Sequence, residues 1–270
     1  MTDIPLTDYS ALDKPEILHH IFYPRQEYQL PGKSSGTEIF IPVERDVALG
    51  ARFHMDSKDG ANILFFHGNG EIVSDYDDLG PFYNRMGINF LPVDYRGYGR
   101  SGGSPSVSSM MSDCRTVYEF TKKWLGEHGY SGPLIVMGRS LGSASALELA
   151  SKYESGIDGL IIESGFAYTE PLLRLLGADL RGMNLSEKDG LNNLDKIRSF
   201  KKPILIIHAE FDHIIPFSDG QAFYDAATSR DKMLLKIPGA NHNDIFSKGL
   251  MEYMAAVKSL VGRVSKSSEQ

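Results

Sequence analysis

Short, mainly apolar runs alternate with amphipathic stretches along most of the chain, and this pattern predicts the elements of the fold. Runs of four to six mainly apolar residues indicate strands buried on both faces. They occur at residues 63–66, 88–93, 134–137, 157–162, 203–207 and 233–237. Stretches with apolar residues at helical spacing occur at residues 74–86, 110–128, 141–153 and 245–261. The chain therefore has the elements of an α/β protein.

Residues 38–44 and 47–54 instead alternate apolar and polar side chains around a charged turn, which is typical of an antiparallel hairpin. From residue 62 onward strands and helices alternate, and parallel strands need crossover connections of that kind. We therefore predict an α/β fold with a mostly parallel central sheet of about eight strands, an N-terminal antiparallel hairpin and helices on both faces.

Length and composition fit one large domain. The 270 residues include 41% hydrophobic and 23% charged side chains, as expected of a globular protein with a substantial core. We expect a lead-in at residues 1–37 that packs on the domain, the domain itself at 38–264, and a polar tail at 265–270. An insertion at about 165–200 follows a strand and is expected to form a short helical cap.

The net charge and the cysteine content limit the classes of partner, cofactor and cellular location that we expect for this protein. The formal net charge of -7 argues against nucleic acid, because a phosphate backbone requires a basic surface. The single Cys114 excludes an internal disulfide and a cysteine metal site. No apolar stretch approaches the ~20 residues that span a bilayer, and residues 1–8 lack the features of a secretory signal. We expect a cytoplasmic protein that needs no metal or organic cofactor, as a monomer or a homodimer.

The motif Gly-Arg-Ser-Leu-Gly at residues 138–142 joins a predicted strand to a small-residue helix. A serine at the apex of such a turn is exposed and strained, as in known nucleophiles, and the turn requires glycine at positions 138 and 142. The motif alone fits an ordinary turn with a solvated serine equally well. If Ser140 is a nucleophile, it needs a base and an acid elsewhere in the chain.

Functional side chains of an open parallel sheet gather in the loops that follow the strands. Among the eight histidines, His242 follows the last strand and precedes the last helix, so it is the best candidate for the base. His213 also follows a strand, but its neighbour Asp212 cannot easily orient it, because adjacent side chains in an extended loop point apart. Asp212 itself follows the penultimate strand and is the best candidate for the acid.

Three other titratable residues follow strands. For His67 we favour a structural role, with its ring tying down the loop that it opens. Glu163 and Glu210 are rival acids, and for both we favour hydrogen-bonded carboxylates that support the site.

A serine hydrolase also needs two backbone N–H donors for the oxyanion of its tetrahedral intermediate. The residue after the nucleophile supplies one of them, which assigns Leu141. We assign the other to Asn69, because the glycines on either side of it let the backbone approach closely.

The chain resembles serine hydrolases of the α/β-hydrolase superfamily, and in particular the branch that holds protein depalmitoylases, monoacylglycerol and lysophospholipid lipases and many bacterial esterases. The resemblance covers roughly residues 38–260 and rests on four stretches, at residues 67–70, 94–101, 138–143 and 239–244. Ala209 and Asn241 stand where the branch often has glycine.

The resemblance implies an α/β-hydrolase fold in which Ser140, Asp212 and His242 form the catalytic triad, and their order in the chain is the one that this fold uses. It also implies that Leu141 and Asn69 supply the oxyanion donors. The expected activity is hydrolysis of carboxylic ester or thioester bonds through an acyl-enzyme.

The insertion at 165–200 is rich in leucine and carries Pro171, which can open a helix. It either packs on the core or forms a cap whose inner face lines an acyl pocket, and we favour the pocket. We expect the substrate, a small-molecule or lipid-like acyl ester, to contact four residues. These are Gly70, Leu172, Leu176 and Ile214.

Other functions stay open. Residues 97–102 match the dinucleotide pattern Gly-x-Gly-x-x-Gly, but Pro105 and further glycines stand where its helix should begin, so we do not favour it. A catalytically silent binding module keeps the hydrolase fold, and an acyltransferase or perhydrolase keeps the triad as well.

Overall fold

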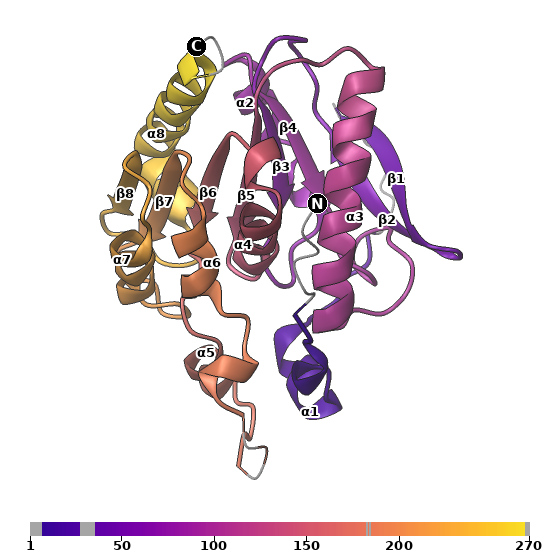
Figure 1. Cartoon of the computed structure of the whole chain (residues 1–270), viewed down its shortest axis with the longest axis vertical. Coiled ribbons are helices and arrows are strands. Elements are labelled where there is room, and N and C mark those ends of the chain that lie inside the picture. Colours follow the sequence, from indigo (N-terminus) through magenta and orange to yellow (C-terminus); the bar gives the residue numbers. More distant parts are fainter. Residues whose placement is uncertain (1–6, 28–35, 182, 184, 268–270) are drawn as a thin grey trace.

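The computed structural model describes residues 7–27, 36–181, 183 and 185–267 (Figure 1). Within them the chain forms helices and strands in the following order: η1 (Ser10–Leu12), α1 (Pro15–Ile21), β1 (Thr37–Glu44), β2 (Val47–Phe53), β3 (Asn62–Phe66), η2 (Val73–Tyr76), α2 (Gly80–Asn84), β4 (Asn89–Val93), α3 (Val107–Glu127), β5 (Leu134–Arg139), α4 (Gly142–Lys152), η3 (Glu154–Gly156), β6 (Gly159–Glu163), α5 (Thr169–Leu175), η4 (Glu187–Asp189), α6 (Asn193–Ser199), β7 (Ile204–Ala209), α7 (Phe217–Ala226), β8 (Lys232–Ile237) and α8 (Ile245–Ser267).

The strands form one sheet in the order β1-β2-β4-β3-β5-β6-β7-β8. The pairs from β4 through β8 are parallel, whereas β1 and β2 form an antiparallel hairpin and β2 is antiparallel to β4. The predicted eight-stranded, mostly parallel sheet with an N-terminal hairpin is confirmed.

Two helical layers cover the sheet, with α3, α4, α6 and α7 on one face and α2 and α8 on the other (Figure 1). Each central strand contributes side chains to the cores under both helical layers, because successive side chains of a strand point to opposite faces of the sheet. In β3, Leu64 and Phe66 join the core under α3 and α4, whereas Ile63 and Phe65 join the core under α2 and α8. This double burial explains why the central strands are almost continuously apolar.

Some boundaries differ from the prediction. The stretch at 74–86, in which Gly80 and Pro81 interrupt the helical spacing, forms two short elements, η2 and α2. Pro81 lies in the first turn of α2, where its missing N–H costs nothing. Helix α8 continues through residues 265–267, which were expected to begin the polar tail, and residues 268–270 lie outside the described residues. The lead-in is described only at residues 7–27 and 36–37; there Leu12 and Ile17 are fully buried in the core.

The glycine-rich loop at 97–102 does not open a helix. Helix α3 begins at Val107, where the Ser106 hydroxyl caps its first turn by accepting from Ser109 N–H. Gly99 has a φ of +55°, and a Cβ on it would lie 1.9 Å from a carboxylate oxygen of Asp94. The glycines thus shape a tight loop against the sheet, without the helix that a dinucleotide site needs.

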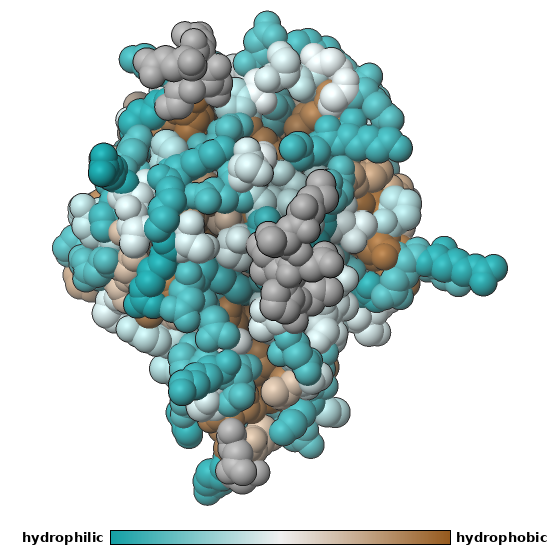
Figure 2. Space-filling model, viewed as in Figure 1, coloured by the Kyte–Doolittle hydropathy of each residue, from teal (hydrophilic) through white to brown (hydrophobic). Residues whose placement is uncertain are grey.

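Helices α1 and α5 lie side by side beyond one end of the sheet (Figure 1), joined by a hydrogen bond between His20 Nδ1 and the carbonyl oxygen of Leu176, 3.0 Å apart. Since α5 follows β6, this is the end at which the parallel strands finish. Hydrophobic atoms show between these two helices in Figure 2, on a face that is otherwise mostly hydrophilic. Among the helices of the described residues, none has the length and apolarity to span a bilayer.

Candidate active site

Ser140 occupies a sharp turn between β5 and α4. Its φ is +50°, a left-handed backbone conformation that residues other than glycine rarely adopt. A Cβ on Gly138 would lie 2.2 Å from the carbonyl oxygen of Gly142, and a Cβ on Gly142 would lie 2.1 Å from that of Phe66. The backbone leaves no room for side chains at either position, which is the steric reason for the two glycines of the motif.

His242, in the loop between β8 and α8, lies beside Ser140. Its Nε2 is 3.1 Å from Ser140 Oγ, and its Nδ1 is 2.8 Å from Asp212 Oδ2. A carboxylate can only accept, so His242 Nδ1 carries the proton and donates it to Asp212. Nε2 is then left to accept a hydrogen bond from the serine hydroxyl, which is the geometry that a general base needs.

Asp212, in the loop after β7, is buried, and backbone N–H groups of its own loop bind its carboxylate. Its Oδ1 accepts hydrogen bonds from the N–H groups of Ile214 and Ile215, at 3.0 and 2.8 Å. Burial by itself raises the pKa of Asp212, but the bond and charge of His242 and these two backbone donors outweigh it and hold the pKa below its ordinary value. Asp212 is therefore a charged acceptor at neutral pH.

The rival residues have other partners. Glu163 accepts from Arg139 and from the Tyr253 hydroxyl, and Glu210 accepts from Gly239 N–H and Lys236. The His213 side chain is exposed at the surface.

The buried His67 ring lies 3.1 Å from Asp94 Oδ1 through Nε2 and 2.8 Å from the Gly68 carbonyl through Nδ1. Burial lowers the pKa of His67, but Asp94 outweighs it and raises that pKa above its ordinary value. These contacts match the loop-fastening role that we favoured.

Leu141 and Asn69 both line the same cavity as Ser140 and His242. Within the described residues, neither of their N–H groups donates to a protein acceptor. The side chain of Asn69 has its own partners. Its Oδ1 accepts from Tyr23 N–H at 2.8 Å and from the Tyr98 hydroxyl at 2.7 Å. The asparagine side chain therefore fastens the loop to the segment that carries Tyr23.

Gly70 does not lie where the sequence placed it. It is absent from the residues that line the cavity, and its carbonyl oxygen accepts a 3.0 Å hydrogen bond from Arg25 Nε. Its φ of +75° is a left-handed backbone conformation that glycine adopts readily. Gly70 therefore shapes the loop and is not in contact with the cavity.

The cavity beside Ser140 has a volume of about 170 Å³ and is lined mainly by apolar side chains. The predicted residues Leu172, Leu176 and Ile214 are among them. The C-terminal part of the predicted cap, α6, packs against α4 in the core, with Ile197 fully buried, so only the part before it covers the cavity. Residues 182 and 184 of the predicted cap lie outside the described residues.

Sequence reasoning missed the contribution of α1 and α3 to this cavity. Ile21 of α1 and Val107 and Met110 of α3 also line it. The amphipathic spacing in residues 16–22 shows that α1 buries one face, but no pattern in the sequence indicates that the face covers Ser140. Within the described residues, no three His, Cys, Asp or Glu side chains gather in a way that could hold a metal ion.

Sequence comparison finds relatives over most of the chain. Residues 57–185 match the family model described as "Serine aminopeptidase, S33". Alpha/beta hydrolase domain-containing protein 17B of Xenopus laevis is 31% identical over 208 residues, which are 74% of this chain and 66% of that protein. The human protein 17C is 32% identical over 215 residues, 77% of this chain and 60% of that protein. The chain thus spans at most about two thirds of the length of these relatives.

Solved structures share the fold. An esterase of Pyrococcus furiosus superposes with a TM-score of 0.70 at 20% identity, covering 90% of this chain and 98% of that one. Est1E of Butyrivibrio proteoclasticus, with ferulic acid bound, superposes with a TM-score of 0.69 at 19% identity, covering 83% and 98%.

Proposed function

The chain belongs to the α/β-hydrolase superfamily, and from that membership we propose that it is a serine hydrolase of carboxylic ester or thioester bonds. The observation that supports this proposal most is the hydrogen-bonded series Ser140, His242 and Asp212 at the wall of an apolar cavity. All three residues come from loops at the carboxyl ends of strands, where open α/β sheets bind their ligands.

In the proposed reaction, His242 Nε2 takes the proton of Ser140 as Oγ bonds to the substrate carbonyl carbon. Asp212 holds the imidazole in the required tautomer and stabilises its positive charge. The tetrahedral intermediate then collapses: the bond from carbon to the leaving oxygen or sulfur breaks, and that atom takes the proton from Nε2. In the second half of the reaction, His242 Nε2 takes a proton from water as the water oxygen bonds to the acyl carbon. The second tetrahedral intermediate then collapses: the bond from that carbon to Ser140 Oγ breaks, Oγ takes the proton from Nε2, and the carboxylic acid is released.

The oxyanion of each tetrahedral intermediate would be bound by the backbone N–H groups of Leu141 and Asn69. Three features support these donors. Both residues border the cavity at Ser140, both N–H groups lack a protein acceptor within the described residues, and Leu141 directly precedes α4, whose N-terminus favours negative charge. Donors that are already in place need no reorganisation during the reaction.

The substrate that fits the cavity best carries an apolar acyl group. Leucine, isoleucine, methionine and phenylalanine side chains form most of its wall. An aminopeptidase, as the matched family model is described, must instead bind the substrate's ammonium group, usually with a free carboxylate. Glu71 is the one carboxylate among the described residues that line the cavity, and it is already paired with Arg139. The site therefore favours esters over peptides.

The test is hydrolysis of p-nitrophenyl esters from acetate to palmitate, beside aminoacyl p-nitroanilides, by the wild-type protein and by Ser140→Ala. Ser151→Ala is a matched control, because Ser151 lies on α4 and its hydroxyl donates to the Glu148 carbonyl of the same helix. We expect ester turnover that Ser140→Ala abolishes and Ser151→Ala retains. Equal ester rates in the wild type and Ser140→Ala, or turnover of the anilides alone, would refute the proposal.

A further inference from the structure

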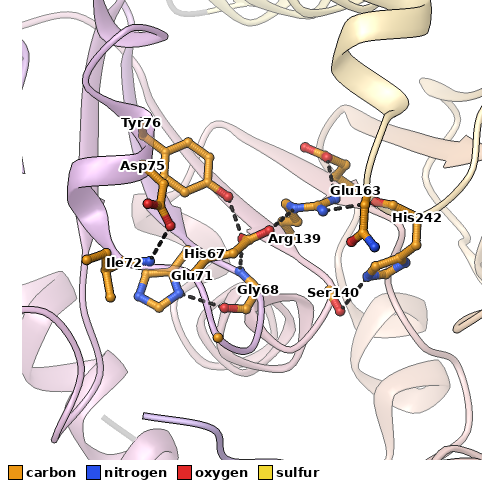
Figure 3. A network of polar contacts seen from close by, with 12 residues as sticks. His67, Gly68, Glu71, Ile72, Asp75, Tyr76, Arg139, Ser140, Glu163 and His242 are labelled. Atoms are coloured by element: carbon orange, nitrogen blue, oxygen red, sulfur yellow. Dashed lines mark hydrogen bonds and ion pairs between the residues drawn. The ribbon is translucent and has the colours of Figure 1, made fainter. Parts of the chain in front are cut away.

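Arg139 is the residue directly before Ser140 and ends strand β5. Its position in the Gly-x-Ser-x-Gly motif accepts any residue as far as the turn is concerned, because only the flanking glycines are sterically required. The arginine is nevertheless only 7% exposed. It lies where the ends of β5 and β6 meet the loops that follow β3 and β8 (Figure 3). A buried guanidinium is costly unless each of its donors is satisfied.

Each nitrogen of the guanidinium donates to a different residue. Arg139 Nε donates to Glu71 Oε1 at 2.8 Å, and NH1 donates to Glu163 Oε1 at 2.9 Å. NH2 donates at 2.9 Å to the backbone carbonyl oxygen of His242. A single rigid, planar group thus links the residue before the nucleophile to the backbone of the candidate base (Figure 3).

The contacts extend to the loop that carries the oxyanion donor. The second oxygen of Glu71 accepts from the N–H of Gly68 at 2.6 Å and from the Tyr76 hydroxyl at 2.5 Å. Gly68 directly precedes Asn69, so the carboxylate bridges Arg139 and the backbone beside the proposed oxyanion donor. Burial raises the pKa of Glu71, but the charge of Arg139 and the bonds from Tyr76 and Arg139 outweigh it and lower the pKa to about 2.

On the other side, Glu163 is fixed in the same way. Its second oxygen accepts from the Tyr253 hydroxyl at 2.6 Å, and its backbone carbonyl accepts from Ser140 N–H at 2.9 Å. Burial by itself lowers the pKa of Arg139, but the charges of Glu71 and Glu163 outweigh it and raise that pKa well above its ordinary value. Arg139 is therefore a charged donor at neutral pH.

We propose that Arg139 is a positioning residue for the reaction: its guanidinium sets the His242 backbone and, through Glu71, the oxyanion loop at fixed places relative to Ser140. This inference rests on the proposed function of Ser140 and His242. The reacting atoms lie on three loops that are separate in the sequence, and a displacement of about 1 Å between reacting groups can cost about 100-fold in rate. A shared, rigid hydrogen-bond partner prevents such displacements without touching the substrate.

The kinetic test compares Arg139→Lys with Arg52→Lys. Arg52 is a matched control because its guanidinium is also buried and bonded to three residues, Asp77, Glu27 and Glu38, but it lies on β2 away from Ser140. Lysine keeps the charge and loses the planar fork. We expect Arg139→Lys to lower kcat on the best p-nitrophenyl ester by about 10- to 100-fold with KM changed less than about threefold. Wild-type kcat in Arg139→Lys, or an equal loss in Arg52→Lys, would overturn the proposal.

A second variant covers the case in which Arg139→Lys does not fold. Glu71→Gln changes one atom type and keeps the side-chain shape, but its amide nitrogen cannot accept from Gly68 N–H while its oxygen accepts from Arg139. We expect the same pattern, a lower kcat at nearly constant KM. Wild-type kcat in this variant would contradict the coupling through Glu71.

Hydrogen exchange gives a readout that needs no substrate. If the wild type shows no Ser140-dependent turnover, the proposed function fails, yet the positioning claim is still tested by amide exchange in residues 67–71 and 239–244. We expect faster exchange in both segments in Arg139→Lys, or in Glu71→Gln if the lysine variant does not fold, and no change in either segment in Arg52→Lys. Unchanged exchange in both segments of the variant measured would overturn the inference.

Discussion

The imidazole Nδ1 of His242 lies 2.8 Å from Oδ2 of Asp212, although 30 residues separate the two in the sequence. The other oxygen of the same carboxylate is held by two backbone N–H groups, so its position is set independently of the histidine. A carboxylate in this place keeps the proton on Nδ1 and leaves Nε2 free to act as the base.

Replacing that carboxylate with an amide tests its role. We expect Asp212→Asn to lower kcat by about 10³- to 10⁴-fold with little loss of folding, because an amide that donates to Nδ1 forces the wrong tautomer. Glu210→Gln is the control, since the Glu210 carboxylate accepts from Lys236 and from Gly239 N–H. Steady-state kinetics on a short p-nitrophenyl ester measures both variants. Near-wild-type turnover in Asp212→Asn would show that another residue orients His242.

The cap should determine which acyl chain lengths the protein hydrolyses efficiently. Leu176 lines the cavity, whereas the neighbouring Leu175 is 57% exposed, so the two form a matched pair. We expect Leu176→Trp to reduce kcat/KM for long-chain esters by about tenfold or more while acetate and butyrate esters change by less than about twofold. Leu175→Trp should leave the whole chain-length series unchanged. An unchanged chain-length preference in Leu176→Trp would contradict the contact between Leu176 and the acyl chain.

The turn at Ser140 requires glycine at position 142. A methyl group there would overlap the Phe66 carbonyl oxygen, so we expect Gly142→Ala to lower the free energy of unfolding by about 3 kcal/mol or more. Gly126, on the exposed face of α3, has no atom within 4 Å of an added Cβ, and Gly126→Ala should raise stability by up to about 1 kcal/mol. Urea denaturation measures both changes. Equal stabilities would mean that the loop has more room than the structure shows.

The ion pair of Glu71 with Arg139 should be visible in the pH dependence of stability. The pKa of Glu71 is lowered in the folded protein from 4.5 to about 2, so the folded state favours the charged carboxylate. Its stabilising effect is fully present above the unfolded pKa and is lost as pH falls from about 4.5 toward 2. We expect the difference in unfolding free energy between wild type and Glu71→Gln to be constant above pH ~5.5 and to shrink below pH ~4.5. A difference that does not depend on pH would mean that this carboxyl is not the group that titrates.

The sheet and the three triad candidates were predictable because both leave local signals. Strands buried on two faces are continuously apolar, and residues that follow strands meet at one edge of a parallel sheet, so Ser140, Asp212 and His242 could be brought together by position alone. No local sequence pattern predicted that Tyr23 N–H binds the Asn69 side chain or that Ile21 lines the cavity. Those contacts depend on where α1 and the residues that follow it pack against the rest of the domain, and local sequence patterns do not specify that position.

The role of Arg139 could not be predicted from the sequence for a different reason. Its place in the motif is unconstrained by the turn, and its partners lie 24 to 103 residues away in the sequence. Gly70 shows the reverse case: its place beside the assigned oxyanion donor suggested a substrate contact, but its carbonyl oxygen instead accepts a hydrogen bond from Arg25.

The most direct test of the central claim is the site of covalent modification by an alkyl fluorophosphonate, identified by mass spectrometry of the digested protein. We predict one adduct on Ser140 in the wild type, much slower labelling in His242→Gln and no adduct in Ser140→Ala. Labelling of a different residue at the same rate in all three proteins, or no labelling of folded wild type, would contradict the assignment of Ser140 as the nucleophile.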